Sequence, residues 1–124
     1  MSQVKTYKDL IFWQKSYLAG RKVIALCRLL PKDTISLIIS KQIIRSATSI
    51  GANIAEGFGR YKGKEYERFL QIALGSAQET EYWLLLISDE YPQIRKQCIE
   101  PQLLVQEAIK MLIKSLSTLH STNH

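Results

Sequence analysis

The segment that decides the fold is residues 33–57, which read DTISLIISKQIIRSATSIGANIAEG. Its apolar side chains recur every three or four residues, which is the spacing of one face of an α-helix. Asp33 or Thr34 can cap the start of this helix, and the glycines that begin at Gly57 break it. We therefore expect one long helix from Thr34 to about Glu56.

One face of this helix alternates large and small side chains, and three further isoleucines widen it. Small side chains on the face would let a neighbouring helix approach closely. The predicted face consists of Leu37, Ser40, Ile44, Ala47, Gly51 and Ile54, widened by Ile39, Ile43 and Ile50. This pattern predicts a helix packed inside a tight bundle.

Three other segments carry a helical pattern, and none of the chain shows the alternation of a strand. They cover about residues 9–30, 64–91 and 101–119, and Asp9 can cap the first of them. Prolines 31, 92 and 101 lie in the connections, because proline does not continue a helix. We expect residues 121–124 to form a frayed tail. The predicted core stripes are Leu10, Trp13, Tyr17, Gly20, Ile24 and Cys27, then Tyr66, Phe69, Ala73, Ser76, Thr80, Trp83 and Ile87, then Leu104, Ala108, Met111, Ile113 and Leu116. Short connections predict an all-α, antiparallel up-down-up-down four-helix bundle, one domain over residues 1–124.

The first helix is apolar on a second side as well. This side contains Phe12, Ala19, Val23, Leu26 and Leu30. Either the bundle wraps around it or a second subunit covers it, and the two-sided pattern favours an oligomer.

Composition limits the class of protein. The chain has 124 residues, 46% of them hydrophobic, which is the size and apolar content of one folded domain and too short for a two-domain enzyme. Cys27 and Cys98 lie far apart without a Cys-x-x-Cys pair, so we expect neither a disulfide framework nor a zinc site. No apolar run has the length of a membrane span or of a signal peptide, so we expect a cytoplasmic protein with reduced thiols.

The charge is unevenly divided between the two halves of the chain. Residues 1–64 contain 12 Lys and Arg against 3 Asp and Glu, a net +9, whereas the remainder contains 5 against 8, a net −3. A basic half can bind the phosphates of RNA or DNA with little sequence preference, although such rows can also be solvated helix faces or pair with a neighbour. The candidate phosphate-binding residues are Lys15, Arg21, Lys22, Arg28, Lys41, Arg45, Arg60, Lys62 and Lys64.

The sequence offers no convincing active site. Its only histidines, His120 and His124, lie at the C-terminus, and no Glu-x-x-His pair or phosphate-binding glycine loop is present. Asn53 and Glu56 share a helix face, where a hydrogen-bond network with Arg45 or Arg60 is expected more than a catalytic pair. We therefore expect a non-enzymatic protein without metal or cofactor, and an enzyme acting on a small anion near Asn53 is the weakest alternative.

Three motifs together resemble a known family. They are YKDLIFWQKS over residues 7–16, QIIRSATSIGANIAEGFGR over residues 42–60 and FLQIALGSAQETE over residues 69–81. In order and spacing they resemble the four-helix-bundle proteins encoded in 23S ribosomal RNA intervening sequences, a family that includes relatives of the accessory variability determinant of diversity-generating retroelements. The resemblance implies a homopentameric ring without catalytic activity, a basic surface able to bind nucleic acid and, in the retroelement branch, a reverse transcriptase as partner.

The resemblance also singles out residues, and we interpret all of them as structural except Arg45 and Arg60, which stay candidates for phosphate binding. The residues that match the family motifs are Trp13, Gln14, Arg45, Asn53, Glu56, Gly57, Gly59 and Arg60, and this chain has Gly51 where many relatives carry proline. Our leading hypothesis is a homo-oligomeric protein that binds RNA or DNA through the basic residues named above. The alternative is a scaffold that docks a polymerase and has no affinity for free nucleic acid.

Overall fold

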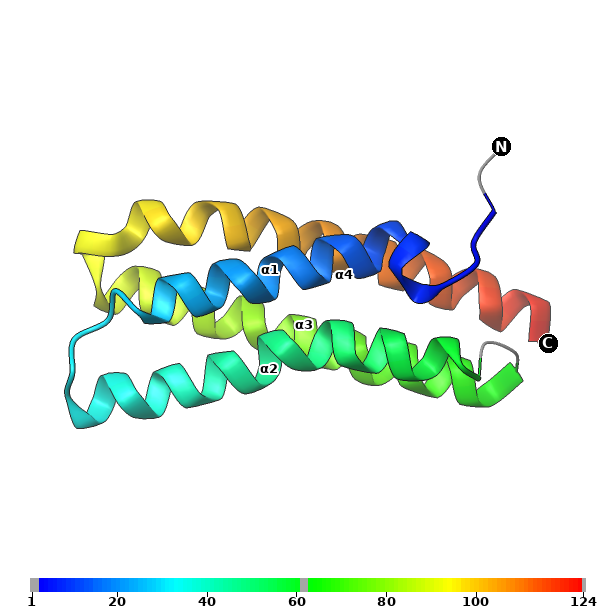
Figure 1. Ribbon diagram of the computed structural model, residues 1–124, viewed down its shortest axis with the longest axis horizontal. Helices are drawn as coiled ribbons and strands as arrows, with labels where there is room; N and C mark the ends of the chain where they lie inside the picture. Colours follow the sequence, from blue (N-terminus) through cyan, green and yellow to red (C-terminus); the bar gives the residue numbers. More distant parts are fainter. Residues whose placement is uncertain (1–2, 61–62, 124) are drawn as a thin grey trace.

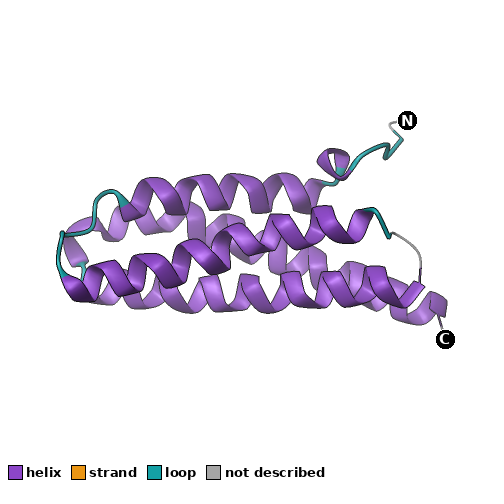
Figure 2. Cartoon of the chain, turned by 60° about the horizontal axis from the view of Figure 1, so that its bottom comes forward, coloured by secondary structure: helices purple, strands orange, loops and turns teal. Residues whose placement is uncertain are grey.

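The part of the chain that the structure describes forms four long helices and two short 3-10 turns. The computed structural model describes residues 3–60 and 63–123, and within these ranges no strand is present (Figures 1 and 2). The elements in chain order are η1 (Tyr7–Asp9), α1 (Ile11–Cys27), α2 (Thr34–Phe58), α3 (Gly63–Glu90), η2 (Pro92–Ile94) and α4 (Arg95–Asn123). The all-helical fold expected from the sequence is confirmed.

The helices run antiparallel in an up-down-up-down bundle. α1 and α3 each pack against α2 and α4, whereas α1 and α3 lie diagonally opposite each other. The connections between α1 and α2 and between α3 and α4 lie at one end of the bundle. The end of α2, the start of α3, η1 and the end of α4 lie at the other (Figure 1).

A side-chain cap marks the start of α2, whereas α1 begins without one. Asp33 caps α2 as predicted, because its carboxylate accepts a hydrogen bond of 2.8 Å from the amide of Ser36. Asp9 does not cap α1: it lies in η1, where its carboxylate accepts hydrogen bonds from the amides of Lys5 and Thr6. As a result α1 begins two residues later, at Ile11, and it ends at Cys27, earlier than the predicted boundary at Leu30.

The fourth helix is longer than the sequence predicts at both ends. We expected a linker up to Pro101, but α4 begins at Arg95 and contains Pro101 in its second turn. Proline removes one hydrogen bond from a helix interior, so the pattern indicated a boundary there. The ring of Pro101 is fully buried, and this packing offsets the lost bond. The helix also continues to Asn123, into the segment predicted to fray.

The face of α1 that enters the core is the one predicted to lie outside it. Phe12, Val23 and Leu26 are buried, whereas Tyr17 from the predicted core stripe is 54% exposed. A helix with two apolar stripes carries no periodic signal that says which stripe faces inward. The stripe that contains Trp13 and Tyr17 lies along the boundary with α2 instead.

The core is formed by buried aliphatic side chains of all four helices. In α2 it is centred on Ile43, Ile50 and Ile54, and Leu37 from the predicted face is exposed. The predicted small residues Ala47 and Gly51 do lie buried on the α1 side of α2. In α3 and α4, Leu84 and Leu112 are central members of the core, and neither belongs to a predicted stripe. Ile113, which was predicted for the core, is exposed.

Candidate nucleic-acid interface

Several of the predicted phosphate-binding cations are neutralised within the bundle. On the α1–α4 side, the ammonium of Lys15 lies 3.2 Å from Glu107, and that of Lys22 lies 3.2 Å from Glu100. On the α2–α3 side, Arg45 donates a hydrogen bond of 2.6 Å to Glu79. Exposed ion pairs of this kind stabilise a fold weakly, but they reduce the positive field that a phosphate would meet.

Arg60 connects the end of α2 to the start of α3. Its guanidinium donates to the carboxylate of Glu56, lies 3.7 Å from that of Glu65 and sits over the ring of Phe69, 5.3 Å from the centroid. The hydrogen bond and the charge of Glu56 raise the pKa of Arg60 above its ordinary value. Arg60 therefore holds the end of α2 against the start of α3.

The other residues of the family motifs also hold the bundle together. The amide of Asn53 donates to the carbonyl and the hydroxyl of Ser49, at 2.8 and 2.9 Å, and Ser49 bonds Ser76 of α3 at 3.0 Å. A Cβ at Gly57 would lie 2.7 Å from that of Phe69, so only glycine permits this helix approach. Asn53 is thus part of a hydrogen-bond network, but its partner is Ser49 and not the predicted Arg45 or Arg60; of the predicted pair, Glu56 is the one that bonds Arg60.

The two residues of the first motif pack around the start of α1. The indole of Trp13 lies against the backbone of Gly51, where a Cβ would be 3.4 Å from its Nε1 atom. Gln14 donates a hydrogen bond of 2.8 Å to the carbonyl of Lys8 and so fixes η1 on α1. Gly59, from the second motif, caps the end of α2.

Four of the predicted cations have no acidic partner among the residues that the structure describes. They are Arg21, Arg28, Lys41 and Lys64. Lys62 lies outside the described residues. Other described cations without an ion pair were not predicted, among them Lys32, next to the cap of α2, and Arg68, which follows Lys64 by one turn of α3. The spacing of four between Lys64 and Arg68 was the signal that could have identified Arg68.

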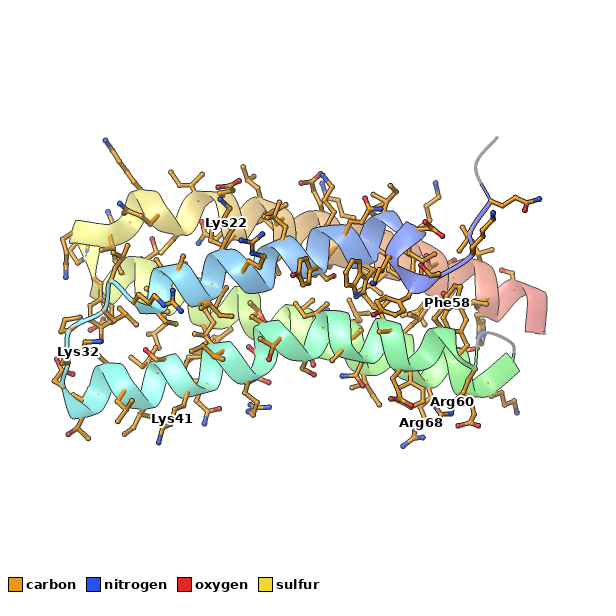
Figure 3. All side chains as sticks on the ribbon, viewed as in Figure 1. Lys22, Lys32, Lys41, Phe58, Arg60 and Arg68 are labelled. Atoms are coloured by element: carbon orange, nitrogen blue, oxygen red, sulfur yellow. The ribbon has the colours of Figure 1, made fainter. Side chains whose placement is uncertain are left out.

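Part of this set forms a basic strip beside α2. Figure 3 shows Lys32 at the loop that leads into α2, Lys41 on α2 and Arg68 at the opposite end of the bundle. We call Lys32, Lys41, Lys64 and Arg68 the α2 edge. The 25 residues of α2 span about 38 Å at 1.5 Å per residue, which is close to one turn of duplex at about 34 Å.

Neither metal ligands nor a membrane span is evident in the described parts of the chain. No group of three His, Cys, Asp or Glu side chains within residues 3–60 and 63–123 could hold a metal ion. No helix in the same residues is long and apolar enough to cross a membrane. Cys27 and Cys98 are both free thiols, and burial raises the pKa of each above its ordinary value.

These features define an antiparallel four-helix bundle with a basic edge. The sequence profile of the 23S rRNA-intervening sequence proteins matches residues 8–114, and the chain belongs to that family. A crystal structure of a protein with unknown function from the S23 ribosomal protein family of Bacteroides thetaiotaomicron is similar, with 34% identity and a TM-score of 0.77. The match covers 86% of this chain and 98% of that one. No curated protein matches the sequence.

Proposed function

We propose that this protein is a non-enzymatic, homo-oligomeric bundle that binds RNA or DNA along the α2 edge. The observation that carries the proposal is the distribution of charge. Lys15 and Lys22 of α1 are paired with carboxylates of α4, whereas Lys32, Lys41, Lys64 and Arg68 have no acidic partner among the described residues. Unpaired lysine and arginine on an exposed strip bind phosphates without reading bases.

Two properties of binding follow from this chemistry. Each neutralised phosphate of duplex DNA contributes about −0.9 to the slope of log affinity against log salt, so four contacts per protomer give about −3.6. Contacts to the backbone alone do not discriminate strongly between sequences. Assembly of several protomers multiplies the contacts, so an oligomer binds a long nucleic acid far more tightly than a monomer does.

The homo-oligomeric part of the proposal is supported by the surface between α1 and α2. This surface is lined by Trp13, Tyr17, Ile24 and small residues of α2, and Tyr7 of η1 borders one end of it. An apolar strip of this kind on a small protein is typical of an interface.

Binding to labelled structured RNA and duplex DNA, measured at low and moderate salt, tests the proposal. The double variant Lys41→Glu/Arg68→Glu should bind at least about tenfold more weakly at low salt, with a salt slope that is less steep by about 2. The matched control is Lys110→Glu/Lys114→Glu, which changes the same charge on exposed positions of α4 and should bind almost normally.

Equal affinities for the two double variants would contradict the α2 edge as the binding surface. A folded oligomer that binds neither nucleic acid would favour the scaffold alternative. In that case, recovery of one defined protein partner after nuclease treatment would be the next experiment.

A further inference from the structure

An open apolar groove runs between α1 and α2. At one end the rings of Trp13 and Tyr17 are stacked, with centroids 5.0 Å apart and planes 17° apart, and Tyr7 meets Trp13 edge-on at 5.1 Å. The opposite wall consists only of small side chains of α2. These are Ala47, Thr48, Gly51, Ala52 and Ala55, and together with the aromatic wall they enclose about 320 Å³.

The groove continues toward the α1–α2 loop. Ile24 lines both the aromatic end and a second hollow of about 680 Å³, whose other apolar residues include Cys27, Leu37 and Ile44. We call the two hollows together the α1–α2 groove. A long groove with small side chains on one wall is shaped to receive the ridge of a helix.

The rim of this groove is basic. Arg21 borders the aromatic end, and Arg28 and Lys32 border the second hollow. Neither Arg21 nor Arg28 has an acidic partner among the described residues. The one carboxylate at the rim, that of Asp33, is engaged in capping α2. A helix that fills the groove should therefore carry an apolar stripe flanked by acidic residues.

The chain itself presents such a surface on α3. Five glutamates form ion pairs with lysine or arginine. Three acidic residues of the described chain have neither an ion pair nor a capping role. They are Glu81, Asp89 and Glu90, in the C-terminal part of α3. Between them lie Tyr82 and Leu85, which are 56% and 57% exposed. We call Glu81, Tyr82, Leu85 and Asp89 the α3 outer face.

We propose that the α1–α2 groove of one copy receives the α3 outer face of a second copy. The inference rests on the homo-oligomer proposed above and names its two contacting surfaces. The two surfaces are complementary in hydrophobicity and in charge, because an apolar groove with arginines at its rim meets apolar side chains with carboxylates beside them. A groove-to-groove dimer would instead bring Arg21 and Arg28 against the same cations of its partner.

This pairing joins two different surfaces. Because α1 and α3 are diagonally opposed, each copy that uses its groove still offers its α3 outer face to another copy. Contacts of this head-to-tail kind close into a ring when the rotation between neighbours allows it. Lys32 belongs to the α2 edge and also borders the groove, so the two surfaces share this residue. Lys41 and Arg68 lie outside both contact surfaces, so their substitution alters the proposed nucleic-acid surface without altering the interface.

Sedimentation velocity and native mass spectrometry of charge-reversed variants test the pairing. Arg21→Glu/Arg28→Glu makes both surfaces acidic, and Glu81→Arg/Asp89→Arg makes both basic. Each double variant should raise the concentration needed for assembly by about tenfold or more. Combination of all four substitutions in one chain restores opposite charges and should restore assembly to within about threefold of the unmodified protein.

The controls separate this inference from the proposed function. If the unmodified protein is a monomer at all accessible concentrations, both the proposed homo-oligomer and the proposed pairing are wrong. If it assembles but either double variant assembles normally, or the fourfold variant fails to recover although circular dichroism shows it folded, the pairing is overturned. If the groove variants keep their mass and lose nucleic-acid binding instead, the groove is a nucleic-acid site. Lys110→Glu/Lys114→Glu should leave the mass unchanged.

Discussion

The two sides of α2 differ in how they meet their neighbours. Toward α3 the boundary is closed by hydrogen bonds: Ser46 accepts one from Thr80 at 2.9 Å, and Ser36 bonds Tyr91 at 2.7 Å. Toward α1 the boundary has aromatic rings on one wall and alanine or glycine on the other, and it stays open. A buried polar pair fixes one register between two helices, whereas an open apolar groove leaves surface for another molecule.

The closed boundary should be the more sensitive of the two to added volume. Gly57→Val places a side chain where a Cβ alone would lie 2.7 Å from that of Phe69, and we expect a loss of about 3 kcal/mol or failure to fold. Chemical denaturation measures the change. Gly75→Ala is the control, because nothing lies within 4 Å of its Cβ position, and it should gain about 0.5–1 kcal/mol. Similar stabilities for the two variants would contradict the tight packing at Gly57.

Loss of a single hydroxyl should also distinguish this boundary from an exposed site. Thr80→Val keeps the shape of the side chain and removes its hydrogen bonds to Ser46 and Ser76, at a cost of about 1–2 kcal/mol. Thr118→Val on the exposed surface of α4 should change stability by about 0.5 kcal/mol or less. A neutral Thr80→Val would show that packing alone, and no polar pair, holds α2 against α3.

The open boundary should respond in assembly more than in folding. Ala52→Trp fills the groove from the α2 wall, so it should weaken self-association about tenfold and leave the unfolding free energy within about 1 kcal/mol. The matched control is Ala25→Trp, since Ala25 is exposed on α1 outside the groove. Sedimentation velocity measures the first quantity and thermal unfolding the second. Equal losses of assembly in both variants would mean that the groove is not the contact surface.

The smallest expected effect concerns the cap that begins α2. Hydrogen bonds from Ser36 lower the pKa of Asp33 below its ordinary value. The folded state therefore gains stability from the carboxylate above that ordinary value and loses it as the pH falls through the folded-state pKa. Asp33→Ala should lower the melting temperature at pH 7 slightly, with a difference that narrows below about pH 4. Asp33→Asn keeps a cap that does not titrate and should show little pH dependence of this kind.

The cap at Asp33 was predictable because it depends on neighbouring residues, whereas long-range packing was not predictable. Two local predictions were wrong: Asp9 lies in η1 and does not cap α1, and α1 ends at Cys27 and not at Leu30. Pro101 was misassigned because its burial against other helices overrides its local preference. The core face of α1 was wrong because both of its stripes are apolar.

For the candidate nucleic-acid interface, too, the sequence identified the basic residues but not their long-range pairing. Runs of basic residues identified Arg21, Arg28 and Lys41, which remain unpaired within the described chain. The sequence could not show that Lys15 and Lys22 face Glu107 and Glu100, because these partners belong to a helix that only the folded topology brings beside α1. Pairing between charges distant in sequence therefore decides which of the predicted cations can meet a phosphate.

The placement of the two tryptophans gives each side of α2 its own optical reporter. Trp13 stands in the groove beside Tyr17, whereas the indole of Trp83 donates a hydrogen bond of 3.0 Å to Glu79 on the closed side. With Trp83 replaced by phenylalanine, the emission of Trp13 should shift when a second molecule covers the groove. Trp83 lies edge-on to Tyr82 of the α3 outer face, with ring centroids 5.0 Å apart, so with Trp13 replaced its emission should shift when that face is covered. Fluorescence can thus follow the two surfaces of the proposed contact separately, without an attached dye.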